Sequence, residues 1–215
     1  MVGIFGEMVP PNVSPRRLDL LYSGILESVA MSVVATVAGV VLSIPIGFIA
    51  ADNIVPKPIY LIGRGFIVAS RSLHELIVAI IAVKAFGIGA FAGVFTLVFG
   101  TVGFYSKLLT EDIEDIDSTQ VDAIRSTGAG GIQTVVFAVL PQVLPRMIGL
   151  TVYRWDINIR HSTVVGIVGA GSVGATLMNS FNTYELDFSL TIIIAIVAIV
   201  LLGEGTSALI RRRIN

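Results

Sequence analysis

Arginine and histidine side chains within apolar stretches are the groups in this sequence best suited to chemistry. Arg71, Arg154 and Arg160 interrupt segments that are otherwise hydrophobic, and His161 follows the last of them. A guanidinium inside a membrane is costly, so such residues usually pair with an acid or line a water-filled cavity. An unpaired guanidinium can bind an oxyanion through two parallel hydrogen bonds. If the apolar stretches cross a membrane, each of these residues is expected either to pair with an acid or to face a water-filled pathway.

Two pairs of charged residues have the spacing of ion pairs on one helix face. Arg71 precedes Glu75 by four residues, and Asp156 precedes Arg160 by the same interval. Residues four apart are neighbours on a helix surface, so each pair can neutralise itself. We therefore predict two ion pairs, which would give these four side chains a structural role.

Arg154 and Arg146 differ from those pairs because no acid lies three or four residues from either of them. They are the better candidates for surplus positive charge near a pathway, although Arg146 could instead extend its head group to the membrane interface. His74 and His161 could assist, but a lone histidine in a helix is more often a packed core residue. Arg154 is therefore the first choice for a group that contacts an anion.

A polar island separates two long apolar stretches. It runs from Asp122 to Gly128 and is followed by the small residues 129–131. Thr119 and Asp122 have the spacing of a capping box, and Gly128 is suited to end a helix in a left-handed conformation. The pattern predicts a short helix and turn at the membrane surface, a compact knob that a groove of another protein could receive. An ordinary loop is the alternative.

The composition identifies the class of protein. The mean hydropathy is +0.89, and only 13% of residues are charged, against about 25% in soluble domains. This is typical of an integral membrane protein, and 215 residues leave room for five or six helices in one domain. A net charge of −1 argues against nucleic-acid binding. The absence of cysteine excludes disulfides and thiolate metal sites.

We expect an all-α chain that forms a single transmembrane domain, 1–215. Residues 1–19 carry three prolines and mixed charge and are predicted to be a surface segment. Residues 161–184 are uncharged and rich in glycine, and we interpret them as re-entrant or peripheral, with a sixth span as the alternative. The predicted spans are about 24–51, 59–84, 87–109, 133–158 (kinked by prolines) and 187–210, with the polar loop at about 117–131.

The orientation follows from positive charges next to the membrane ends. The run 211–213 consists of three arginines and predicts a cytoplasmic C-terminus. Five spans then place the polar loop in the cytoplasm and the N-terminus outside, with Arg16 and Arg17 as a mild violation. A six-span topology would put the loop and the C-terminus on opposite faces, so five spans are preferred.

Two further patterns carry little functional weight. Residues 169–174 superficially match a Gly-x-Gly-x-x-Gly fingerprint, but no strand, turn and helix unit surrounds them and no lysine follows. Tight packing or an irregular gate segment explains these glycines better. The acidic run 112–117 next to the polar loop is more typical of a solvated face than of a metal site.

The polar island resembles the EAA loop of permease subunits of ATP-binding-cassette importers. That loop begins with an acid and two alanines, which a spacer of three residues separates from a glycine. After nine further residues come an isoleucine, one residue of any type, a leucine and a proline. Here Ile124 replaces the second alanine and Ala138 the isoleucine. The resemblance implies the type I importer permease fold, with five or possibly six transmembrane helices and a cytoplasmic coupling helix. The coupling residues that it implies are Asp122, Ala123, Ile124, Arg125, Gly128, Leu140 and Pro141.

Within that superfamily the chain is most similar to the phosphonate importer permease. The stretches that carry this resemblance are 71–76, 140–145, 153–160 and 162–166. His74 stands where these permeases commonly have proline, so the resemblance does not by itself imply a kink there. The methionine importer permease shares the glycine-rich stretch and is the competing family.

This resemblance implies the membrane subunit of an importer for phosphonate or a related phosphorus oxyanion, such as phosphite or a phosphate ester. It would form a homodimer in the cytoplasmic membrane of a prokaryote, surrounded by lipid, with two cytoplasmic ATPase subunits and an extracytoplasmic substrate-binding protein. ATP and Mg would bind those ATPases, and this chain would hold no cofactor and no catalytic residue. A secondary transporter or channel is another alternative, and a membrane enzyme a third. The predicted pathway residues are Arg154, Arg160, Arg71, His161 and Ser162.

Overall fold

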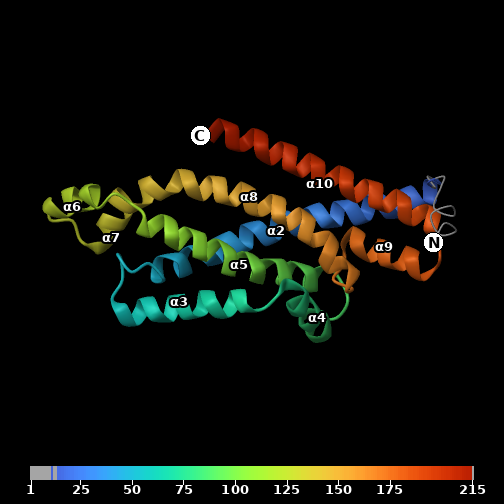
Figure 1. Cartoon of the computed structure of the whole chain (residues 1–215), viewed down its shortest axis with the longest axis horizontal. Helices are drawn as coiled ribbons and strands as arrows, with labels where there is room; N and C mark the ends of the chain where they lie inside the picture. The colour runs from blue at the N-terminus through green and yellow to red at the C-terminus, as the bar shows by residue number, and fades with distance from the viewer. Residues whose placement is uncertain (1–10, 12–13, 215) are drawn as a thin grey trace.

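The computed structural model describes residue 11 and residues 14–214, and all regular structure in this part of the chain is helical. Most of the predicted surface segment 1–19 lies outside the described residues, but its end is already helical. The helices are α2 (Pro15–Ile49), α3 (Lys57–Ser72), α4 (Glu75–Phe86), α5 (Ala90–Glu114), α6 (Ser118–Ser126), α7 (Gly131–Thr134), a π-helical turn (Val135–Val139), α8 (Leu140–Ile167), α9 (Ser172–Asn182) and α10 (Leu186–Ile214) (Figure 1).

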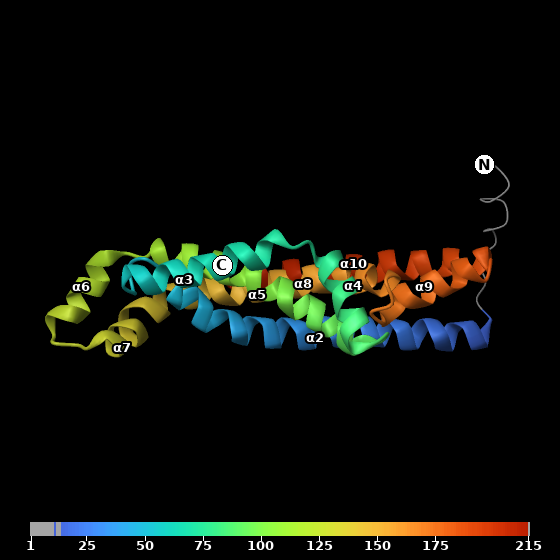
Figure 2. The ribbon, with the colours of Figure 1, turned by 90° about the horizontal axis from the view of Figure 1, so that it is seen from below.

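The helices form an elongated bundle with two distinct ends. In Figures 1 and 2, α6 and α7 lie at one end, while α9 and the start of α2 lie at the other. Helix α10 starts beside α9 and runs back toward the α6 end. The last helix therefore points toward the end that carries the polar island, as the five-span topology requires, and α2 begins at the opposite end.

Four helical segments in the described residues are long and apolar enough to cross a membrane, and the bent pair α3 and α4 is a fifth candidate. Helix α9 has 11 residues and is therefore about 16 Å long, roughly half the thickness of the hydrocarbon core. That length fits a peripheral position for α9, whereas residues 161–167 of the predicted re-entrant or peripheral segment belong to α8. The exact span boundaries stay predictions.

Helices α2 and α5 pack closely because small residues let their backbones approach. A Cβ atom at Gly39 would lie 2.5 Å from Thr101 on α5. Interhelical hydrogen bonds support the contact, since the hydroxyl groups of Ser106 and Thr110 donate to backbone oxygens of α2 at 3.2 and 3.0 Å. Small residues and hydroxyl groups are the usual means of helix association in lipid, where burial of apolar surface gives no driving force.

The predicted second span is not one helix but two, which meet at an angle of 86°. Leu73 between them is extended, and His74 is the N-cap of α4, where its Nδ1 accepts from the Leu76 N–H at 3.3 Å. A histidine cap can thus end one helix and start the next without proline. The prediction of an ion pair between Arg71 and Glu75 is wrong, because the bend puts them on different helices.

The start of α8 contains a proline and is irregular for that reason. Pro141 has no N–H to donate to the carbonyl four residues earlier, and such positions disturb an α-helix. The chain accommodates it with the π-helical turn, in which the Leu140 N–H bonds to the Val135 carbonyl. Helix α8 then continues past Pro145 to Ile167, beyond the predicted end of this span at residue 158.

The glycine-rich connection between α8 and α9 is a packed loop. Gly169 and Gly171 have φ values of +91° and +78°, which favour glycine. The N-terminus of α9 is bound by α2, where Glu27 accepts from the Ser172 N–H and Ser28 from the Val173 N–H, both at 3.1 Å. This arrangement agrees with the packing explanation and not with a nucleotide loop.

Candidate functional site

The polar island forms α6, which has one buried and one exposed face. Val121 is buried and Ile124 half-buried, and both pack against the apolar core between α5 and α8. They are three residues apart and thus share a helix face. Asp122, Ala123 and Arg125 are exposed. The free face of α6 is therefore available to another protein, while the opposite face anchors the helix.

The two ends of α6 were predicted with unequal success. The helix ends as expected, with Gly128 at φ +86°. The expected capping box of Thr119 and Asp122 is wrong, because the N-cap is Asp117, whose Oδ1 accepts from the Thr119 N–H at 2.9 Å. This hydrogen bond to the charged carboxylate holds the pKa of Asp117 below its usual value. The cap lies earlier because an aspartate already precedes the first helical residue.

Two side chains of α8 attach the segment before α6 to the bundle. Gln142 Oε1 accepts from the Asp117 N–H at 2.9 Å, and its Nε2 donates to the Ala138 carbonyl at 2.8 Å. Arg146 Nη1 bonds to Asp112 and Asp115, at 3.2 Å each. The expectation that Arg146 has no acid partner is therefore wrong, since its partners come from α5 and the residue after it. Sequence analysis did not identify Gln142. Its position directly after Leu140 and Pro141 could have indicated that it belongs to the same site.

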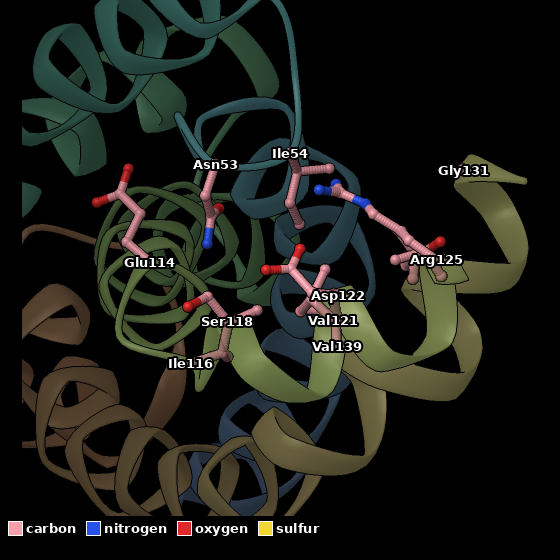
Figure 3. Close-up of a pocket in the computed structure, with 12 residues that line it drawn as sticks. Asn53, Ile54, Glu114, Ile116, Ser118, Val121, Asp122, Arg125, Gly131 and Val139 are labelled. Carbon is pink, nitrogen blue, oxygen red and sulfur yellow. The ribbon is translucent and has the colours of Figure 1, made fainter. Parts of the chain in front are cut away.

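A cavity of about 400 Å³ lies behind α6. Figure 3 shows the carboxylate of Asp122 and the guanidinium of Arg125 pointing toward Ile54 and Asn53, on the connection between α2 and α3. Of the other predicted coupling residues, Leu140 packs against the core and Pro141 is exposed at the start of α8. The two charged residues of α6 thus face the connection between α2 and α3.

A polar network crosses the middle of the bundle. Arg154 on α8 is only 2% exposed, and its Nη2 donates to Glu75 Oε1 on α4 at 3.0 Å. Its Nε donates to Thr101 Oγ1 on α5, also at 3.0 Å, and its guanidinium lies 5.3 Å from the Phe104 ring centre. The prediction of surplus charge on Arg154 is therefore wrong. The bend that separates Glu75 from Arg71 makes this acid available to Arg154.

Asn158 extends the network to α2. Its Nδ2 donates to Thr36 Oγ1 at 2.9 Å and to Thr101 Oγ1 at 3.1 Å, and the side chain is fully buried. Sequence analysis missed this residue. The available signal was its place four residues after Arg154, which puts both on one face of α8. The network therefore connects α2, α4, α5 and α8.

The remaining predicted pathway residues lie around one end of the network. His161 hydrogen-bonds through Nδ1 to the carboxylate of Glu75. Arg160 pairs with Asp156 at 3.6 Å, which confirms the predicted pair. Ser162 is buried, and its hydroxyl donates to the Ile159 carbonyl at 2.7 Å. These contacts give Arg160 and Ser162 structural partners within α8.

A second cavity, of about 350 Å³, opens where α3 and α4 meet α8. Of the predicted pathway residues, Arg71 and His161 line this cavity, and Arg160 and Ser162 do not. His74 and Glu75 line it as well. Arg154 contacts the same carboxylate that lines this cavity. Three of its polar lining residues lie close together at the α3–α4 bend, and His161 of α8 joins them from a distant part of the sequence. This second cavity is the strongest candidate for an anion site, and the free face of α6 is the strongest candidate for a docking site.

The fold and these two sites define a polytopic membrane component of a transport system. Residues 43–215 match the family described as binding-protein-dependent transport system inner membrane component, and the chain belongs to this family. The phosphate-import permease protein PhnE of Mycolicibacterium smegmatis is 43% identical over 99% of this chain, which spans 40% of that protein. The phosphite transport system permease protein PtxC of Stutzerimonas stutzeri is 38% identical over 96% of this chain and 75% of its own length.

A solved structure supports the same fold. A chain of the MetNI methionine transporter in an inward-facing conformation has a TM-score of 0.79 at 22% identity, covering 94% of this chain and 100% of that one. The architecture is thus that of type I importer permeases, as the EAA-like loop implied. This likeness concerns the fold alone.

Proposed function

We propose that this chain is the permease subunit of an ATP-binding-cassette importer that moves phosphonate or a related phosphorus oxyanion across the cytoplasmic membrane. The observation that carries the proposal is the identity of 38–43% to permease proteins named for phosphate and phosphite, which extends over nearly the whole chain. The methionine transporter chain with the same fold is 22% identical. The oxyanion assignment is therefore preferred to the methionine alternative.

In this proposal α6 is the coupling helix, with the exposed residues Asp122, Ala123, Arg125 and Gly128 available to the ATPase and Ile124 anchoring the helix. Two copies of the chain pair, and each receives one ATPase subunit on its α6, while a binding protein delivers substrate to the opposite face. Closure of the ATPases would move α6, and its anchors Gln142 and Arg146 would pass that motion to α8. This gives alternating access with no catalytic residue in the chain. The N-terminus would be outside and the C-terminus inside.

The proposed pathway centres on the cavity at the bend between α3 and α4. Arg71 and His161 line it, and Arg154 acts behind it by holding Glu75. Arg154 is thus a positioning residue, although a direct contact with substrate was our first expectation. Pathway roles for Arg160 and Ser162 stay predictions.

The proposal is tested by expressing the chain with its cognate ATPase and binding protein in a strain without its own phosphonate, phosphite or phosphate uptake. Uptake of at least one of these anions, dependent on ATP, is the expected result. Replacing residues 118–126 with a Gly/Ser linker should abolish it while the chain remains in the membrane. Uptake that survives this replacement would point to a secondary transporter or channel, and a binding protein that holds methionine tightly would point to the competing family.

A further inference from the structure

Arg71 lies on the wall of the cavity at the α3–α4 bend without a protein partner. It makes no hydrogen bond or ion pair with any residue that the structure describes, whereas Arg64, Arg146, Arg154 and Arg160 each bond to an acid. An arginine in an apolar segment usually pairs or lines a water-filled space. The guanidinium of Arg71 therefore has its N–H donors available to a ligand.

His74 adds a second donor to this cavity wall. Its Nδ1 accepts from the Leu76 N–H, so the proton of the neutral ring is on Nε2, which can donate to a ligand. His161 is held differently, because its Nδ1 bonds to a carboxylate that can only accept, and this nitrogen therefore carries a proton. Three nitrogen-bearing side chains thus surround a space of about 350 Å³, which is roughly the volume of ten water molecules.

Glu75 is the only acid among the residues that line this cavity. Its two oxygens bond to Arg154 and His161, and a carboxylate has about four acceptor positions. Its side chain is 21% exposed, so it can accept one more hydrogen bond from a ligand. This free acceptor position favours an anion that brings an O–H group, because a deprotonated anion oxygen at the same place would face the carboxylate oxygen with no proton between them.

The geometry points to an oxyanion subsite in this cavity, in which Arg71 and His74 donate to the anion and Glu75 selects for an anion that carries an O–H group. This rests on the proposed function and makes Glu75 a specificity-determining residue. Monoprotonated phosphonate, phosphite and phosphate have a P–O–H donor, whereas sulfate has none near neutral pH. The bend between α3 and α4 lies between the two ends of the bundle (Figure 1).

The experiment measures broadening of the ³¹P resonance of methylphosphonate by the full chain in lipid nanodiscs. ATPase subunits are left out because their nucleotide sites would bind phosphate themselves. Arg71→Met should weaken binding about tenfold, as loss of a charge-assisted hydrogen bond implies. Lys84→Met removes an exposed cation of α4 away from the cavity and should leave binding unchanged. Equimolar sulfate should not compete in the natural chain but should compete in Glu75→Gln, whose amide can donate.

Several results would overturn the inference. The subsite is rejected if the natural chain does not broaden the methylphosphonate resonance, or if Arg71→Met binds as tightly as the natural chain. It is also rejected if Arg71→Met and Lys84→Met weaken binding equally. The selective role of Glu75 is rejected if sulfate still fails to compete in Glu75→Gln. If Arg71→Met does not fold, Arg71→Lys keeps the charge without the bidentate fork and should still weaken binding. If the complete transporter takes up the anion but the chain alone does not bind it, the proposed function stands and the subsite is rejected. If the chain binds the anion but the complete transporter does not take it up, the subsite stands and the proposed function is rejected.

Discussion

Arg146 and Arg154 lie eight residues apart on α8, and each pairs with acids from other parts of the chain, yet their surroundings differ. Arg154 and Glu75 have side chains that are 3% and 21% exposed. The side chains of Arg146 and Asp115 are 53% and 76% exposed. The first pair belongs to the mostly buried network in the middle of the bundle, and the second ties the segment before α6 to α8.

This difference teaches where the molecule is rigid and where it can yield. Breaking a buried pair leaves a charge without solvent or partner, whereas exposed pairs contribute little because water replaces the lost contact. The ion pairs at the α6 end are therefore weak and replaceable, as the proposed movement of that segment with a partner would require. The buried network holds α2, α4, α5 and α8 together.

The largest effect is expected from removing Arg154. Arg154→Met should lower the free energy of unfolding by about 3–5 kcal/mol, since Glu75 loses its main partner inside the bundle. Arg146→Met should cost about 0–1 kcal/mol, because its pairs are exposed. Unfolding of the purified chain in detergent measures both. The double variant Arg154→Met/Glu75→Gln should recover part of the lost stability, because it also removes the charge of Glu75. If Arg154→Met and Arg146→Met lower the free energy of unfolding equally, the buried network and the α6 end do not differ in this way.

The next effect concerns the close packing that surrounds the buried network. Gly39→Ala would bring a Cβ atom to 2.5 Å from Thr101, which binds both Arg154 and Asn158. We expect a loss of about 1–3 kcal/mol from overpacking. Gly149→Ala on α8 is the matched control, because no atom lies within 4 Å of its Cβ position. A Gly39→Ala variant as stable as the control would show that α2 and α5 can separate at no cost.

A smaller effect is expected at the coupling end from Gln142→Ala. It removes two hydrogen bonds at the surface and should cost about 0.5–1.5 kcal/mol. The local result is faster hydrogen exchange at the Asp117 amide, which donates to Gln142. Gln133→Ala serves as the comparison, since it frees the Gly130 amide instead. If Gln142→Ala leaves the Asp117 amide protected, Gln142 does not attach the segment before α6 to α8.

The smallest effect is the pH dependence of the α6 cap. The Thr119 N–H bonds to the charged carboxylate of Asp117 and lowers its pKa below 3.8. A depressed folded pKa means that this stabilisation is complete above the usual value and is lost as the pH falls through the lowered one. Protection of the Thr119 amide should decline over that acidic range. In Asp117→Asn it should be flat with pH, and a decline there would assign the effect to another group.

Much of the fold followed from local patterns. The apolar runs indicated the membrane helices, Gly128 ended α6 as expected, and the spacing to Leu140 and Pro141 indicated the family. The pair of Asp156 and Arg160 was also found, because both residues lie on one continuous helix. In each case the interaction involves neighbours along the chain or a composition summed over many residues.

Apart from the α6 cap and the bend at Leu73, which are local, the failures arise because the true partners are distant in sequence. Glu75 lies 79 residues before Arg154, and no periodicity links them. A spacing of four between Arg71 and Glu75 predicts an ion pair only if one helix continues through both residues. The helix is interrupted at the extended residue Leu73, where the sequence has no proline or glycine to indicate a break. Arg71 and His161 were both predicted as pathway residues, but the cavity that joins them could not be predicted, because they are distant in sequence.

By itself the sequence determined that this is a helical membrane protein with an EAA-like loop, because hydropathy and the spacing of neighbouring residues can be read directly along the chain. Only the tertiary structure decided which acid neutralises which arginine, since that depends on the bend at Leu73 and on the depth at which α4, α5 and α8 meet. The same packing leaves Arg71 unpaired among the described residues and places it, with two histidines and Glu75, around one cavity.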